Sequence, residues 1–192
     1  MNILNENFQR DHGVLKIVGD APNANLAYEN GNLTVEKTAP GWGTAGCTMW
    51  SALPNMQPLD SFLFNFTPMS NRVGTPADPA ATFYKIHLAV DRQDEEMTQD
   101  GYGIYVEGGT IKLYDPAHII AEFGAPQLNR MHRVVISVRS DSDLDVYMHG
   151  PGLPGYLGKI PGPFLNRRGS LVVNMFSVDT LKFHDFKVQV AA

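Results

Sequence analysis

The strongest constraint on the fold is the alternation of apolar and polar residues along most of the 192-residue chain. In the segment 132–150, two alternating runs, 134–138 and 144–148, flank the polar cluster 140–143. Because successive side chains of a strand point to opposite faces, each run places its apolar residues on a single face. The segment therefore predicts a β-hairpin with one buried face and a Ser/Asp turn.

The same two-residue period recurs along the chain, and no long stretch has the 3.6-residue apolar spacing of a helix. The 18 glycines and 13 prolines supply turn signals between the runs. We therefore predict an all-β, antiparallel sandwich or barrel of about ten or more strands. The other predicted strands span 13–18, 31–37, 46–53, 61–68, 81–91, the hairpin 102–115, 170–178 and 179–190.

The spacing of the loops indicates one domain over residues 1–192. The loops 68–80 and 150–169 are too short to separate two cores, and predicted strands continue after each. No internal repeat of fixed period is visible, which argues against a propeller or solenoid.

The net charge of −5 and the scattered 15 lysines and arginines disfavour a nucleic-acid partner, because phosphate would repel an acidic surface. No apolar run approaches the ~20 residues of a membrane span. Cys47 is the only cysteine, so no internal disulfide forms. The start of the chain lacks the pattern of a signal peptide. We expect synthesis in a reducing cytoplasm, which also suits a virion protein released by lysis.

Four parts of the sequence share their order and motifs with a known fold: "LNENFQRDHG" with "LAYENGNLTVEK", "FLFNFTP", "NRMHRVVISVRSDSDLDVYMHG" and "DTLKFHDFKV". Together they resemble the concanavalin A-like lectin/glucanase domain, the jelly roll shared by laminin-G-like modules. Met131 replaces the usual aromatic residue and His149 the usual aspartate. The resemblance implies a jelly-roll sandwich whose last strand pairs beside the first. It does not imply one activity, because this fold hosts lectins, glycosidases, lyases and structural modules.

Strand parity predicts a polar and aromatic face that could bind a glycan. If the apolar residues of 86–88, 104–106, 111–113 and 134–136 form the core, the residues between them point outward. Rings stack on the apolar face of a sugar, and charged groups bond its hydroxyls. The same composition is also typical of a solvated sheet. The residues that we predict to bind glycan are Lys85, His87, Tyr105, Lys112, Tyr114 and Arg133, with Glu107 and Arg139 on the same face.

The segment 150–169 is predicted to be a long Gly/Pro loop with many apolar residues and few charges. Such a loop either packs over an open end of its own sandwich or docks on a partner. On the second interpretation, the partner-binding residues are Leu153, Tyr156, Leu157, Ile160 and Phe164.

The acidic cluster at 141–145 has the alternation of a calcium loop. An EF-hand-type loop also needs Gly at its sixth position and Glu at its twelfth, where this chain has Val146 and Gly152. The simplest interpretation is a turn and the polar face of a strand, with a looser calcium site left open. We predict no metal ligand and no cofactor.

Two catalytic alternatives have weaker support. A retaining glycosidase needs two carboxyl groups about 5–5.5 Å apart, and the adjacent residues of the acidic run 94–96 would point to opposite faces of a strand. His87 with Tyr105 or Tyr114 could form an acid–base pair, since "KIH" resembles the "Q-I-H" strand of alginate-lyase-type jelly rolls. The other motifs of that family are absent, so we predict no catalytic residue and no enzyme.

These observations favour a non-catalytic structural or decoration module of a larger assembly, most simply a phage virion surface protein of the head, fibre or tail. The alternative is a lectin-like carbohydrate-binding module, and a hydrolase or lyase of the same fold comes third. The expected partners are other subunits, in a homo-oligomer, and a surface polysaccharide. The expected location is the virion, or otherwise the cytoplasm.

Overall fold

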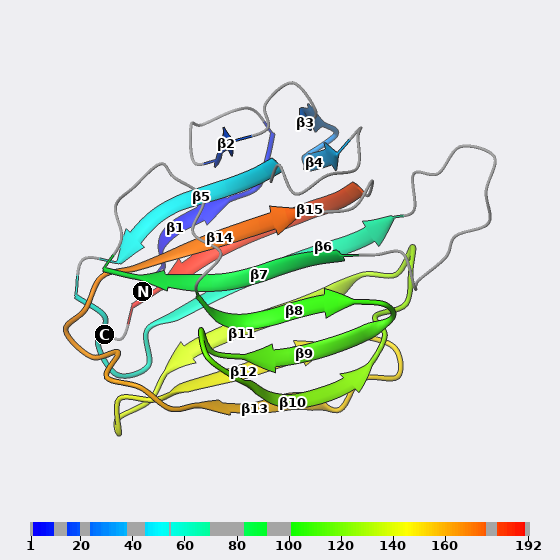
Figure 1. Cartoon of the computed structure of the whole chain (residues 1–192). Helices are drawn as coiled ribbons and strands as arrows, with labels where there is room; N and C mark the ends of the chain where they lie inside the picture. Colours follow the sequence, from blue (N-terminus) through cyan, green and yellow to red (C-terminus); the bar gives the residue numbers. More distant parts are fainter. Residues whose placement is uncertain are drawn as a thin grey trace.

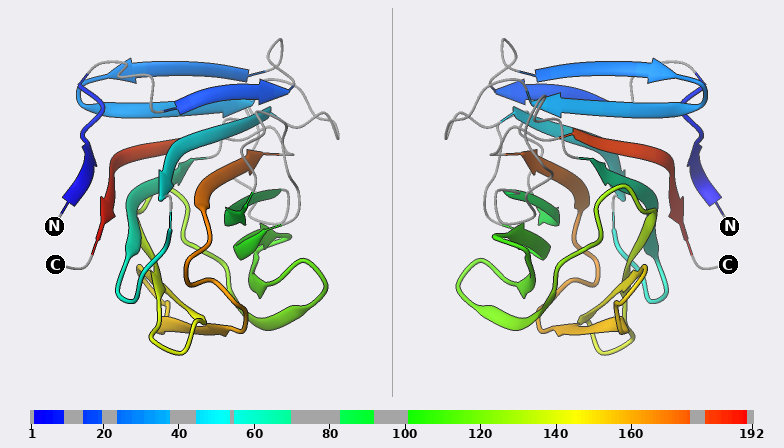
Figure 2. Two further views of the ribbon diagram at one scale, coloured as in Figure 1. Left: turned by 90° about the vertical axis from the view of Figure 1, so that its left-hand side faces the viewer. Right: turned by 90° about the vertical axis from the view of Figure 1, so that its right-hand side faces the viewer.

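Two antiparallel β-sheets pack face to face in the structure of the chain, a computed structural model (Figures 1 and 2). It describes residues 2–9, 15–19, 24–37, 45–53, 55–69, 83–91, 101–175 and 180–190. These residues hold fifteen strands and no helix, so no helix that could cross a membrane occurs among them. The strands are β1 (Asn2–Glu6), β2 (Leu15–Gly19), β3 (Ala24–Glu29), β4 (Asn32–Lys37), β5 (Ala45–Leu53), β6 (Ser61–Met69), β7 (Phe83–Val90), β8 (Tyr102–Glu107), β9 (Thr110–Tyr114), β10 (Ile119–Gly124), β11 (His132–Val138), β12 (Leu144–His149), β13 (Gly155–Ile160), β14 (Gly169–Met175) and β15 (Thr180–Gln189).

The strand order confirms the all-β antiparallel sandwich predicted from the sequence. One sheet has eight strands, in the order β13-β12-β11-β6-β15-β4-β3, with β1 also paired to β15. The other has seven strands, in the order β10-β9-β8-β7-β14-β5-β2, and faces the viewer in Figure 1. The first and last strands lie side by side, as the resemblance implied, with Leu4 opposite Val188.

The core lies between the sheets and follows the two-residue period of the strands. On β6, the inward rings of Phe64 and Phe66 lie 5.9 Å apart between centroids, and Phe66 meets Tyr84 of the opposite sheet edge-on at 6.2 Å. Aromatic pairs at such distances add to the free energy of apolar burial. The apolar residues that parity assigned to the core have no exposed surface: Ile86, Leu88, Ile104, Val106, Ile111, Leu113, Val134 and Ile136.

Two hairpins show how turn chemistry sets the register. Gly108 and Gly109 join β8 to β9 with φ of 57° and 79°, as the Glu-Gly-Gly-Thr turn predicted. Asn30 and Gly31 join β3 to β4 with φ of 51° and 71°. Positive φ at both central residues is the signature of a type I′ turn, for which Asn-Gly is strongly preferred. The second hairpin was not predicted as a unit, although its turn signal is strong.

The prediction of a long loop over 150–169 was wrong. Strand β13 lies inside it and forms an edge of the eight-stranded sheet, paired with β12. The backbone of this strand takes positive φ at Gly155 and Gly158, and its register shifts beside Val146 and Tyr147. Glycines at these positions allow the irregular backbone, and the same glycines made the segment look like a loop.

Candidate functional site

The outer face of the seven-stranded sheet brings together five of the six residues predicted to bind glycan. Cross-strand pairing places Lys85 of β7, Tyr105 of β8 and Lys112 of β9 in one row. His87 and Tyr114 lie in the next row, with Gly103 between them. The parity argument therefore holds across these three strands, because they are neighbours in one sheet.

The part of this group that reaches the surface is a half-buried ring, Tyr105, with the half-buried ammonium groups of Lys85 and Lys112 beside it. Lys112 Nζ lies 4.9 Å from the centroid of the Tyr105 ring. Lys85 Nζ lies 5.6 Å from the same centroid and 5.4 Å from that of Tyr114. The two tyrosine rings meet edge-on, 6.0 Å apart at 80°. Each ammonium lies within the ~6 Å range of a cation–π contact, which holds the rings and cations in a fixed arrangement.

Glu107 sets the charge state of this group. Its carboxylate accepts hydrogen bonds from the Tyr105 hydroxyl and, at 3.0 Å, from Lys112 Nζ. These two bonds lower the pKa of Glu107, so it stays anionic. Burial, together with the bond to Glu107, raises the pKa of Tyr105, so its phenol stays protonated. The face thus presents a neutral ring between an anion and two cations.

His87 and Tyr114 form a buried pair beneath this surface. His87 has no exposed surface, Tyr114 is 6% exposed, and His87 Nδ1 is hydrogen-bonded to the Tyr114 hydroxyl. Gly103 makes this bond geometrically feasible, because it leaves room between the two rings across β8. His87 is thus placed to orient Tyr114 rather than to contact a ligand.

A hollow of about 500 Å³ opens beside these rings. Lys85, Tyr105 and Tyr114 form its sheet side, and the turn 115–119 forms the opposite wall. The Asp115 carboxylate stabilises that turn by accepting hydrogen bonds from the backbone N–H groups of Ala117 and His118, with N···Oδ1 distances of 2.7 Å each. Burial alone would raise the pKa of Asp115, but these bonds outweigh it and lower the pKa, so the carboxylate stays ionised.

The turn 115–119 was missed in the sequence analysis. Its signal was present, because Asp followed by Pro directly after an alternating strand is typical of a turn held by the Asp side chain. What the sequence could not show is that this turn folds back beside the tyrosines, since that depends on the bulged pairing of β9 with β10.

Arg133 does not share this face, and its placement there was wrong. It lies on β11, in the eight-stranded sheet, and points outward on the opposite side of the sandwich. Arg139 also lies on that side, bound to Asp145 of β12. Parity assigns a side chain to one face of its own sheet but does not say to which sheet the strand belongs.

The apolar residues predicted to bind a partner lie mostly inside the protein. Leu157 is 4% exposed, Phe164 1% and Ile160 not at all. Phe164 packs edge-on against Tyr102, with ring centroids 4.8 Å apart. These three residues close the core of their own sandwich and cannot contact a partner. Of the predicted five, only Tyr156, at 47% exposure, and the half-buried Leu153 reach the surface.

Each carboxylate of the acidic cluster at 141–145 is ion-paired with a cation of the protein itself. Arg139 contacts Asp141 at 2.9 Å and Asp145 at 3.1 Å. Lys159 Nζ lies 2.7 Å from Asp143, which also accepts the backbone N–H of Gly162. Among the described residues, no group of three or more His, Cys, Asp or Glu could hold a metal ion. The cluster thus stabilises the β11–β12 hairpin. The acidic run 94–96, considered as a catalytic pair, lies outside the described residues.

A scan of protein-family models and a search of curated proteins find no match. Solved structures do match. Peanut lectin, bound to a nine-residue peptide, superposes with a TM-score of 0.64 at 11% identity, over 98% of this chain and 97% of that one. The fold is that of the concanavalin A-like lectins and glucanases.

Two further concanavalin A-like neighbours are carbohydrate-binding proteins by name or bound ligand. The Emp46p carbohydrate recognition domain, in its metal-free form, matches with a TM-score of 0.58 at 10% identity, over 97% of this chain and 94% of that one. The luminal domain of VIP36, in a form bound to calcium and mannose, matches with a TM-score of 0.59 at 11% identity, over 93% and 85%. At such low identity these matches establish the fold alone.

Proposed function

We propose that the chain is a non-catalytic, lectin-like carbohydrate-binding domain, and that it binds glycan in the hollow beside Tyr105 on the outer face of the seven-stranded sheet. The observation that carries this proposal is a hollow of about 500 Å³ whose sheet side is formed by Lys85, Tyr105 and Tyr114, with the Tyr105 ring held by the ammonium groups of Lys85 and Lys112. That volume lies within the ~300–1,000 Å³ of small-ligand sites.

The chemistry of the hollow suits a sugar. The Tyr105 ring offers a flat apolar surface for the apolar face of a pyranose. Lys85, in the wall of the hollow, can donate to hydroxyl oxygens. Lys112 and Glu107 add a donor and an acceptor beside the same Tyr105 ring. The carbohydrate recognition domains and lectins among the structural neighbours support this interpretation.

The same geometry disfavours catalysis by these residues. A tyrosine base needs a lowered pKa, whereas burial and Glu107 raise that of Tyr105. His87 has no exposed surface, so it cannot reach a glycan from its place beneath Tyr114. His87 and Tyr114 are hydrogen-bonded to each other, but with His87 buried this pair does not offer a glycan the accessible acid and base of a lyase.

The virion-surface role, with a homo-oligomer as its form, stays a prediction from the sequence. Its main structural argument was the apolar segment 150–169, and the burial of Leu157, Ile160 and Phe164 removes that argument. We therefore rank glycan binding first.

Glycan-array screening of the full chain, followed by calorimetry on the best neutral ligand, tests the proposal. Tyr105→Ala should lower affinity about fivefold or more, since an aromatic contact contributes ~1 kcal/mol. Lys112→Met should also weaken binding. Lys182→Met, which removes the same charge from the other sheet, should not. The proposal fails if Tyr105→Ala and Lys112→Met, both correctly folded, bind as the native chain does.

A further inference from the structure

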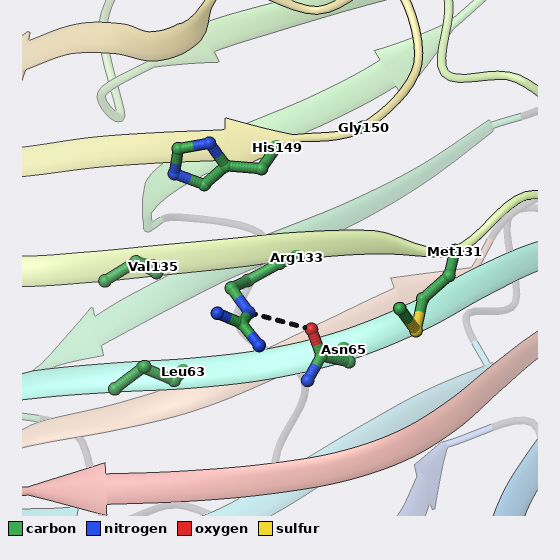
Figure 3. Close-up of a pocket in the computed structure, with 7 residues that line it drawn as sticks. All are labelled: Leu63, Asn65, Met131, Arg133, Val135, His149 and Gly150. Atoms are coloured by element: carbon green, nitrogen blue, oxygen red, sulfur yellow. Dashed lines mark hydrogen bonds between the residues drawn. The ribbon is translucent and has the colours of Figure 1, made fainter.

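A second hollow, of about 490 Å³, lies on the outer face of the eight-stranded sheet, across the core from the proposed glycan site. Figure 3 shows its residues. Leu63 of β6 and Val135 of β11 form an apolar floor, and Met131, 60% exposed, borders it. The side chains of Arg133, on β11, and His149, on β12, also line the hollow.

The guanidinium of Arg133 is held in place without being neutralised. Its Nε donates to Asn65 Oδ1 at 3.0 Å. The amide nitrogen of Asn65, a residue only 7% exposed, in turn donates to both carboxylate oxygens of Asp185, at 2.9 and 2.8 Å. Among the described residues, no carboxylate lies within ion-pair distance of Arg133, and its two Nη groups have no acceptor.

Three other cations of the described chain are ion-paired, unlike Arg133. Arg139, Lys159 and Arg167 each meet a carboxylate at 2.6 to 2.9 Å. Asp185, the nearest acid in the Arg133 network, has its charge met by Asn65 and by Lys187, 4.0 Å away. The two Nη groups of Arg133 thus form a planar pair of donors, and no residue of the described chain supplies an acceptor for them. Such a pair matches a carboxylate in bidentate geometry.

A row of rings extends from this hollow along β12 and onto β13. The His149 and Tyr147 rings are nearly parallel, at 9° and 6.3 Å between centroids. Tyr147 and the exposed Tyr156 are 5.0 Å apart. Rings and an apolar floor add little to the binding of a bare inorganic anion, but they suit the apolar faces of linked sugar rings.

We propose that this hollow is a second, separate binding site for an acidic sugar, in which Arg133 pairs with the carboxylate of a uronic acid unit while Leu63 and Val135 support its ring. Neighbouring units would lie along the His149–Tyr147–Tyr156 row. This site goes beyond the glycan hollow at Tyr105 and does not depend on it.

Calorimetry of the full chain with trigalacturonate tests this site. We expect Arg133→Gln to weaken binding about tenfold or more, because a hydrogen-bonded charge pair is lost. Arg130→Gln removes the same charge from the neighbouring turn, outside the hollow, and should leave the affinity within about twofold of native, as expected for screened surface charge. The fully methyl-esterified trisaccharide should bind at least about tenfold more weakly than the acid.

Three results would overturn the proposal. They are equal losses in Arg133→Gln and Arg130→Gln, equal binding of the ester, and competition by inorganic phosphate at the affinity of trigalacturonate. Amide chemical-shift changes separate the two sites. Trigalacturonate should perturb β6, β11 and β12 in both the native chain and Tyr105→Ala, whereas a neutral glycan should perturb β7 to β9 in the native chain and in Arg133→Gln.

Discussion

Replacement of Gly103 by Ala tests whether the packing of the proposed glycan face requires a residue without a side chain at this position of β8. A Cβ at this position would lie 2.5 Å from the Ile86 carbonyl oxygen and 2.8 Å from the His87 Cα. Both atoms belong to the backbone of the neighbouring strand, so no side chain can move aside and the strands must separate. Overpacking of this kind costs about 1–3 kcal/mol. Strain on the buried His87–Tyr114 hydrogen bond adds about 1 kcal/mol.

The expected loss for Gly103→Ala is therefore about 2–4 kcal/mol in the free energy of unfolding, or a Tm lower by roughly 5–15 °C for a chain of this size. Urea unfolding followed by tryptophan fluorescence measures it. Gly124→Ala is the matched control, because a Cβ there meets nothing within 4 Å. It should be neutral or slightly stabilising, by reducing the entropy of the unfolded chain. Similar free energies for the two variants would refute the reasoning.

Two further predictions concern pH and calcium. Burial lowers the pKa of His132 and His184 below the ordinary 6.5, so the unfolded chain takes up protons before the folded chain as the pH falls. The free energy of unfolding should therefore fall as the pH drops below about 6.5. A constant free energy of unfolding from pH 7 to 5 in urea titrations would contradict this. Asp143→Ala should lower the free energy of unfolding by about 1 kcal/mol, because its hydrogen bond to the Gly162 N–H is lost. The loss should be the same in calcium and in EDTA, since Lys159 already pairs with the Asp143 carboxylate. A loss seen only with calcium in thermal melts would instead indicate a metal site.

The fold was predictable because its strongest signals are local. Alternation predicted β6, β7, β11 and β12 with their inward faces, and the Gly108–Gly109 turn predicted the β8–β9 hairpin. Strands β10 and β13 escaped prediction for a physical reason. Both are edge strands with one partner and irregular register, so neither carries a full alternating pattern.

The site was predictable only in its composition. Parity found Tyr105 and Lys112 as outward residues, but burial depends on what lies over the sheet. Gly101 illustrates this, since a Cβ there would meet the His87 ring at 2.6 Å. Gly101, directly before β8, thus lies against the His87 ring, and these residues are far outside the two-residue window in which parity operates.

The error over Arg133 has the same origin and a useful consequence. Strands β7, β8 and β9 are neighbours in one sheet, so residues of equal parity on them share a surface. After β10 the chain crosses to the other sheet, where β11 pairs with β6, and there the outward direction is reversed in space. A polar row on each sheet therefore gives two outer surfaces separated by a closed core. Ligands at Tyr105 and at Arg133 would therefore not compete, and a chain with both proposed sites would join a neutral glycan to an acidic one.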